Sequence, residues 1–75
     1  MNSLLFIEDD DAIRLALSLA LEDEGYEVVQ APDGRTGLAR FSEREPDLVL
    51  LDLRLPDVSG FDVCRQLRSS SIVPI

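Results

Sequence analysis

Short apolar runs alternate with amphipathic stretches along the whole chain. Residues 4–7 and 48–51 are continuous apolar runs, and acids follow both of them directly. Such runs are typical of strands that are buried on both faces of a parallel sheet. Residues 26–30 alternate in polarity and carry two valines, which predicts a further strand. A last apolar run, residues 72–75, has the pattern expected of the beginning of another strand.

Three segments between these runs have the spacing of amphipathic helices. Acids at the start of the first segment favour a helix N-terminus there, and Gly25 after it is a typical C-terminal stop. Pro46 follows the second segment and the serines at 69–71 follow the third, so both helices are expected to end there. The expected helices cover residues 10–24, 33–44 and 60–69, and their apolar faces carry Ile13, Leu17, Ala20 and Leu21, then Leu38 and Phe41, then Phe61, Cys64 and Leu67.

The order of these elements predicts the fold class. Strands that alternate with helices indicate an α/β protein with a parallel sheet and right-handed crossovers. The sequence has the pattern β-α-β-α-β-α followed by the start of a fourth strand, and nothing in it indicates a second domain. We therefore expect residues 1–75 to belong to a single domain.

Composition narrows the chemistry of this domain. Its 75 residues include one cysteine, Cys64, and no histidine, so the chain cannot form an internal disulfide or an imidazole-based zinc site. Cys64 is expected to be a small core residue. Fifteen acids face seven bases, and the resulting net charge of −8 disfavours direct binding of nucleic acid by these residues. No apolar run is long enough to span a membrane or to act as a signal peptide, which predicts a cytoplasmic protein.

Acids follow two of the buried strands. Glu8 and Asp9 come after the first strand, and Asp52 comes after the third. In a parallel sheet, ligands bind at the carboxyl edge, so three carboxylates would share one cleft if these strands are neighbours. Hard oxygen ligands favour Mg²⁺, Mn²⁺ or Ca²⁺, and an open site with few protein ligands suits Mg²⁺ best. The alternative is that these acids only cap helices and solubilise the surface, as expected of the two acids after Asp9.

The same acids belong to segments that resemble a known family. The segment IEDD, residues 7–10, precedes the segment LLDLRLPDVSG, residues 50–60, and Asp52 stands 43 positions after Asp9. The pair resembles the receiver domain of bacterial two-component response regulators, and the resemblance runs from Leu4 to the last residue. It implies a flavodoxin-like (CheY-like) doubly wound sheet. The third helix is most similar to the class whose members carry a winged-helix DNA-binding domain downstream.

The resemblance also implies a function for each acid of the cluster. Asp52 would be the phospho-acceptor that takes a phosphoryl group from a phosphohistidine on a sensor histidine kinase. Asp9 would bind Mg²⁺ directly, and Glu8 would complete the acidic pocket through water. Asp52 itself and the backbone carbonyl of Arg54 would be further metal ligands. The implied output is regulation of transcription through a DNA-binding domain that residues 1–75 do not contain.

Parts of the family's fold have no counterpart in residues 1–75. The family has five strands in the order 2-1-3-4-5. A Ser or Thr, an aromatic residue and a Lys lie on or directly after its fourth and fifth strands. This chain contains no Lys, and it stops as the fourth strand begins. We therefore expect either an N-terminal fragment of a longer protein or a chain that pairs with another copy through the open edge of the third strand. A fragment of this kind would lack the groups that read the phosphorylated state.

Two other functions remain as alternatives. A Mg²⁺-dependent phosphohydrolase can also use an Asp nucleophile after a parallel strand. Such enzymes usually carry a second Asp two residues later, where this chain has Arg54. An inert or self-associating half-fold would keep the acids only as caps and for solubility. The resemblance favours a signalling module rather than an enzyme.

Overall fold

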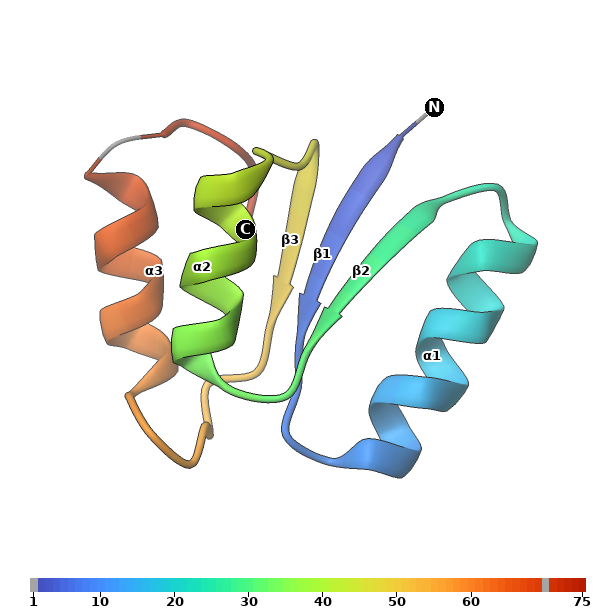
Figure 1. Ribbon diagram of the computed structural model, residues 1–75, viewed down its shortest axis with the longest axis horizontal. Coiled ribbons are helices and arrows are strands. Elements are labelled where there is room, and N and C mark those ends of the chain that lie inside the picture. The colour runs from blue at the N-terminus through green and yellow to red at the C-terminus, as the bar shows by residue number, and fades with distance from the viewer. Residues whose placement is uncertain (1, 70) are drawn as a thin grey trace.

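The computed structural model describes residues 2–69 and 71–75, and the elements follow the predicted order (Figure 1). The described residues form three parallel strands in one sheet and three helices. Ser70, at the predicted break after the third helix, lies outside the described residues. The elements are β1 (Ser3–Ile7), α1 (Asp11–Asp23), β2 (Glu27–Ala31), α2 (Gly34–Glu43), β3 (Leu48–Leu51) and α3 (Gly60–Arg68).

The sheet has the strand order β2-β1-β3, and both pairs are parallel, which confirms the predicted fold class. β1 is central, and its register aligns Ile7 with Ala31 on one side and with Leu51 on the other. Ala31 is paired and fully buried, so β2 ends one residue later than the predicted strand, residues 26–30. The winding of the chain reverses between β1 and β3, and doubly wound sheets bind ligands at the carboxyl ends of the strands at such a reversal.

Different helices cover the two faces of the sheet. α2 and α3 lie side by side on one face, and α1 lies on the other face beside β2 (Figure 1). Since side chains alternate along a strand, every second residue of β1 and β3 points to α2 and α3, and there they form the main core. A fully buried Leu, Ile or Val contributes about 1.5–3 kcal/mol relative to exposure. The core residues are Leu5, Ile7, Ala31, Phe41, Val49, Val63 and Leu67.

Helix α1 buries less of its apolar side than its sequence predicts. Ile13 and Leu17 are 52% and 41% exposed, and the buried residue of this helix is Ser18. The reason is that α1 packs on β2 and β1, which leaves Ile13 and Leu17 over an open hollow lined by Phe6 and Leu50. Despite this exposed apolar surface, none of α1, α2 and α3 combines the length and hydrophobicity that a membrane span requires.

Helix α3 also turns a different face to the core. Val63 and Leu67 are buried, whereas Phe61 is 66% exposed and Cys64 is half-buried. Gly60, Val63 and Leu67 recur at i, i+3 and i+7, so they form the stripe that meets the rest of the fold. The prediction that Cys64 is a core residue is therefore wrong.

Local side chains cap the helix ends, and the predicted signals at the start of α1 and at Gly25 are confirmed. Asp10, Asp33 and Ser59 are N-caps, and the side chain of each accepts a backbone N–H from the first turn of its helix. Gly25 follows the end of α1 with a φ of 96°, a conformation that other residues adopt only with strain. Its N–H donates to the Glu22 carbonyl at 3.0 Å, which closes the helix.

The last apolar run lies along the outer edge of β3. The Val49 N–H donates to the Pro74 carbonyl at 2.9 Å, and Val73 packs against the core. Residues 71–75 have no regular strand geometry, so the expected fourth strand is present only as this beginning. The contact occupies part of the edge that was expected to be open, and pairing with another copy stays a prediction.

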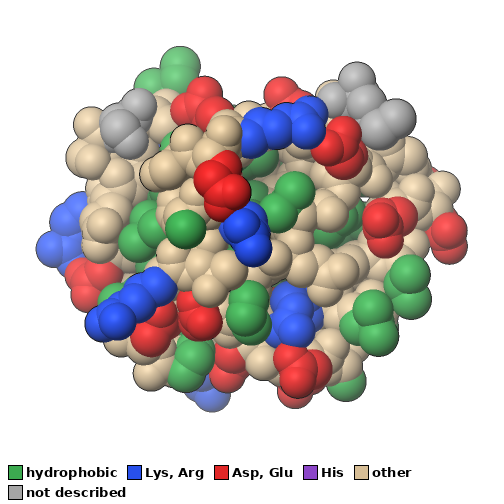
Figure 2. All heavy atoms as spheres, in the orientation of Figure 1, with side chains coloured by type: hydrophobic (Ala, Val, Ile, Leu, Met, Phe, Trp, Pro, Cys, Tyr) green, Lys and Arg blue, Asp and Glu red, His purple; other side chains and the backbone are tan. Residues whose placement is uncertain are grey.

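Charges of both signs cover the surface. Arginine and acidic side chains are interspersed over the face seen in Figure 2. Arg40 pairs with Glu43 at 2.8 Å, and Arg44 pairs with Glu27 at 2.8 Å. Exposed pairs of this kind are worth about 0–1 kcal/mol each, so the fold depends on its core and on buried backbone contacts.

One reciprocal contact joins the N-terminal ends of β1 and β3. The Ser3 N–H donates to Asp47 Oδ2 at 2.7 Å, and the Asp47 N–H donates to the Ser3 carbonyl at 2.9 Å. The first of these bonds holds the pKa of Asp47 below its usual value. The unfolded chain therefore binds this proton more readily. The resulting stability is present above the usual carboxyl pKa of about 3.9 and is lost as the pH falls through the lower folded value.

We expect Asp47→Asn to lower the melting temperature at neutral pH, because a neutral amide is a weaker acceptor than a carboxylate. The difference from wild type should shrink as the pH falls through the lowered folded pKa of Asp47, because the wild-type carboxyl then becomes neutral as well. Melting curves of both proteins across this range measure the effect, with the exposed Asp62→Asn as the control. A difference that persists unchanged in acid would contradict the assignment.

Candidate metal centre

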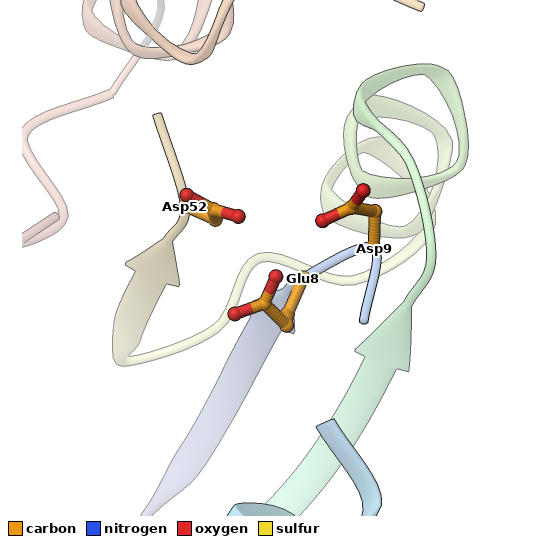
Figure 3. A group of neighbouring side chains, drawn as sticks. All are labelled: Glu8, Asp9 and Asp52. Carbon is orange, nitrogen blue, oxygen red and sulfur yellow. The ribbon is translucent and has the colours of Figure 1, made fainter. Parts of the chain in front are cut away.

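Glu8, Asp9 and Asp52 lie at the carboxyl ends of the neighbouring strands β1 and β3. Because Ile7 and Leu51 are paired, the residues that follow them emerge side by side at this edge of the sheet. The Asp52 N–H donates to the Ile7 carbonyl at 3.0 Å and continues the pairing one residue beyond β3. The three carboxylates turn toward a common space (Figure 3).

The cluster is compact and open to solvent. One oxygen from each of the three carboxylates lies within 4.8 Å of the others. Asp9 is exposed, and Glu8 and Asp52 are half-buried. The Arg54 N–H donates to Asp52 Oδ1 at 3.0 Å, which holds the carboxylate in one orientation. The structure thus brings together the three predicted acids and places the Arg54 backbone beside them.

The pKa values of Glu8 and Asp52 are shifted in opposite directions. Burial raises the pKa of Glu8, and the neighbouring Asp52 raises it further. The Arg54 N–H lowers the pKa of Asp52, and a hydrogen bond with Glu8 lowers it as well. A proton on Glu8 therefore relieves the repulsion, while Asp52 is the member of the pair that stays ionised.

The donor set fits a hard divalent cation. The three side chains offer carboxylate oxygens, the ligands that Mg²⁺, Mn²⁺ and Ca²⁺ prefer. Three carboxylates within 4.8 Å of one another concentrate negative charge, which a bound cation would neutralise. Ca²⁺ takes about six to eight oxygen ligands, whereas Mg²⁺ keeps several waters and needs one or two carboxylates. A shallow pocket with three acids suits Mg²⁺ better.

Two charged residues contact the segments around the acid cluster in ways that the sequence alone does not predict. Arg14 of α1 donates to the Glu8 carbonyl at 2.8 Å and pairs with Asp11 at 2.6 Å. The spacing of three between Asp11 and Arg14 is a signal for that ion pair but not for the contact with Glu8. Asp57 accepts hydrogen bonds from the start of α2, at Gly34 and Arg35. Its partners lie too far away in sequence for any local pattern to reveal them.

The strand order and the acid cluster define a doubly wound α/β protein with an acidic site, suited to a divalent cation, where the winding reverses. Residues 4–75 match the response regulator receiver domain family, and the chain belongs to that family. The resemblance inferred from the two sequence segments is thereby confirmed.

Named relatives and solved structures agree with this family. The transcriptional regulatory protein AfsQ1 of Streptomyces coelicolor is 51% identical over 75 residues, which cover 100% of this chain and 33% of that protein. The response regulator protein TrrA of Thermotoga maritima, in complex with Mg²⁺-BeF, matches with a TM-score of 0.91 and 35% identity over 95% of this chain and 62% of that chain. TrrA in complex with the histidine kinase ThkA matches with a TM-score of 0.91 and 34% identity over 99% of this chain and 64% of that chain.

The matches bear on the fold of the chain and on how much of its relatives it covers. The CheY-like, flavodoxin-like fold is confirmed, because the solved receiver structures superpose on nearly the whole chain. All of this chain matches AfsQ1, but the chain spans only about a third of the length of that relative.

Proposed function

We propose that Asp52 of this receiver domain accepts a phosphoryl group with the help of Mg²⁺, as a step in two-component signalling. The observation that carries the proposal is the convergence of Glu8, Asp9 and Asp52 at the β1–β3 edge. A carboxylate is a suitable covalent nucleophile when it is ionised and oriented. The hydrogen bond from the Arg54 N–H supports both conditions, because it lowers the pKa of Asp52 and fixes its rotation.

In the proposed reaction, a carboxylate oxygen of Asp52 attacks the phosphorus of a phosphohistidine. A new O–P bond forms as the P–N bond to the imidazole breaks. The electron pair of that bond leaves with the nitrogen, which takes up a proton from solvent. The products are an acyl phosphate on Asp52 and a free histidine on the donor protein. Orientation of the carboxylate before the attack lowers the entropic part of the barrier.

Glu8, Asp9, Asp52 and the backbone carbonyl of Arg54 would hold the Mg²⁺ ion. When bound, Mg²⁺ would offset negative charge on the transferring phosphoryl oxygens. Without a cation, the two other acids would repel an anionic donor from Asp52. The complex of TrrA with Mg²⁺-BeF supports the same cation for this chain.

The proposed donor is a sensor histidine kinase, and the proposed output is regulation of transcription. The structure of TrrA with the histidine kinase ThkA supports the first assignment. The name of AfsQ1, a transcriptional regulatory protein, supports the second. Contact with DNA would fall to residues outside 1–75, since the net charge of −8 disfavours it here. We expect the exchange to take place in the cytoplasm.

A phosphohydrolase is the less favoured alternative. Such enzymes usually carry a second Asp two residues after the nucleophile, which moves protons to and from the leaving group. Arg54 occupies the position two residues on, and its backbone rather than its side chain contacts Asp52. This arrangement favours a signalling module over a hydrolytic enzyme.

Acetyl phosphate labelling of the intact protein tests the proposal. With Mg²⁺ present, we expect a mass increase of one phosphoryl group, and chelation of the metal should prevent it. Cleavage after Arg44 and Arg54 gives a peptide that contains two aspartates, Asp47 and Asp52. Borohydride reduction of the acyl phosphate followed by fragmentation identifies which of them is modified. Labelling that is equally strong with and without Mg²⁺, or that modifies Asp47, would contradict the proposal.

A further inference from the structure

Asp57 connects the loop after β3 to the beginning of α2. Its Oδ1 accepts the Gly34 N–H at 2.9 Å, and its Oδ2 accepts the Arg35 N–H at 2.9 Å. The Val58 N–H donates to Oδ1 as well, also at 2.9 Å. One carboxylate therefore joins the loop that begins at Asp52 to a helix 22 and 23 positions earlier in the chain.

The beginning of α2 is capped by two residues from different parts of the chain. The N–H groups of a first helical turn have no partners within the helix, so they need acceptors from elsewhere. Asp33, the N-cap, accepts the Thr36 N–H at 2.7 Å. Asp57 accepts the two N–H groups before it, at Gly34 and Arg35. The positive end of the helix dipole strengthens these bonds to a carboxylate.

The other contacts of the loop are internal or apolar. The Gly60 N–H donates to the Leu53 carbonyl at 3.2 Å and closes the loop on itself. Leu55 and Val58 pack against the core. Over the part of the chain that the structure describes, the hydrogen bonds from residues 53–58 to elements outside the loop and α3 are the two that Asp57 accepts. Apolar packing is not directional, so these two bonds are the directional contacts by which the loop is held against α2.

We propose that Asp57 is a positioning residue for the metal site, because it holds the loop that carries Asp52 and the Arg54 carbonyl against α2. This inference rests on the proposed function, since it assumes that Mg²⁺ binds at the acid cluster. Arg54 is three residues before Asp57, so a loop released from α2 would move its carbonyl relative to Glu8 and Asp9. Residues that orient metal ligands typically change metal affinity by about 10–100-fold when they are lost.

Mg²⁺ titrations of the intact protein by calorimetry test this inference with three variants. Asp57→Ala removes both bonds to α2, and we expect Mg²⁺ binding to weaken about tenfold. Asp57→Asn has the same net charge as Asp57→Ala, but its amide oxygen can still accept the Gly34 N–H, so its affinity should lie between Ala and wild type. Asp62→Asn removes one charge from an exposed ion pair of α3 and should bind Mg²⁺ nearly as wild type does.

The titrations and melting curves separate a positioning function from a general charge effect and from simple helix capping. Equal losses in Asp57→Ala, Asp57→Asn and Asp62→Asn would mean that only charge matters, and would overturn the inference. A lower melting temperature with unchanged Mg²⁺ affinity would make Asp57 a helix cap and nothing more. Should Asp57→Ala fail to fold, Asp57→Asn compared with Asp62→Asn still decides the matter. If wild type binds no Mg²⁺, both the proposed function and this inference are wrong. If wild type and all variants bind Mg²⁺ equally well, only this inference is wrong.

Discussion

Asp52→Asn should abolish phosphoryl transfer to the protein and leave it folded. An amide has no ionised oxygen to attack phosphorus, so labelling by acetyl phosphate should fall by at least about a thousandfold. The fold should survive because the Asn side-chain oxygen can still accept the Arg54 N–H. Mass spectrometry after timed exposure to acetyl phosphate and Mg²⁺ measures the rate in both proteins.

Melting curves separate loss of the nucleophile from loss of structure. Without Mg²⁺, Asp52→Asn should melt at or slightly above the wild-type temperature, because Asp52 contributes to the raised pKa of Glu8 and its charge is then gone. Added Mg²⁺ should stabilise wild type more than the variant, since a ligand stabilises the state that binds it. Asp47→Asn is the matched control at the other end of β3, and it should still be labelled. Labelling of Asp52→Asn at the wild-type rate would remove Asp52 from the mechanism.

The order of elements and the acid cluster could both be predicted from the sequence. Buried parallel strands need apolar residues on both faces, so Leu48–Leu51 is one continuous apolar run. Helices show their own period, and Asp10 and Gly25 mark the ends of α1 by local chemistry. The convergence of Glu8 with Asp52 needed one more condition, that β1 and β3 are neighbours, and the strand order meets it.

Burial of the helix faces and the contacts of Asp57 could not be predicted in the same way. A periodic pattern indicates that a helix has an apolar side, but the position of the sheet decides how much of that side is covered. Ile13 therefore projects over a hollow beside Phe6, and Phe61 stays exposed although it shares a turn with buried Val63. Asp57 meets Gly34 only because of the path of the loop after β3, and no period in the sequence encodes that path.

Gly60→Ala, at the first residue of α3, should strongly disturb the loop that carries Asp52. A Cβ at this position would lie 2.6 Å from the Asp52 carbonyl oxygen and closer still to the Leu53 Cα. Both are backbone atoms, which cannot rotate away, so α3 or the loop would have to move as a whole. We expect a loss of about 3 kcal/mol. In a domain of this size, that loss lowers the melting temperature by about 10 °C or more.

Gly25→Ala separates crowding from backbone strain. Gly25 has a φ of 96°, but a Cβ there would meet nothing within 4 Å, so only the strain of about 1–2 kcal/mol applies. This control should leave the labelling rate of folded protein unchanged because the site is untouched. Gly60→Ala should lower both stability and labelling, since the displaced atoms include the peptide of Asp52 itself. A wild-type melting temperature for Gly60→Ala would show that the loop has room to yield. Lowered stability with normal labelling would instead show that α3 moves and Asp52 keeps its place.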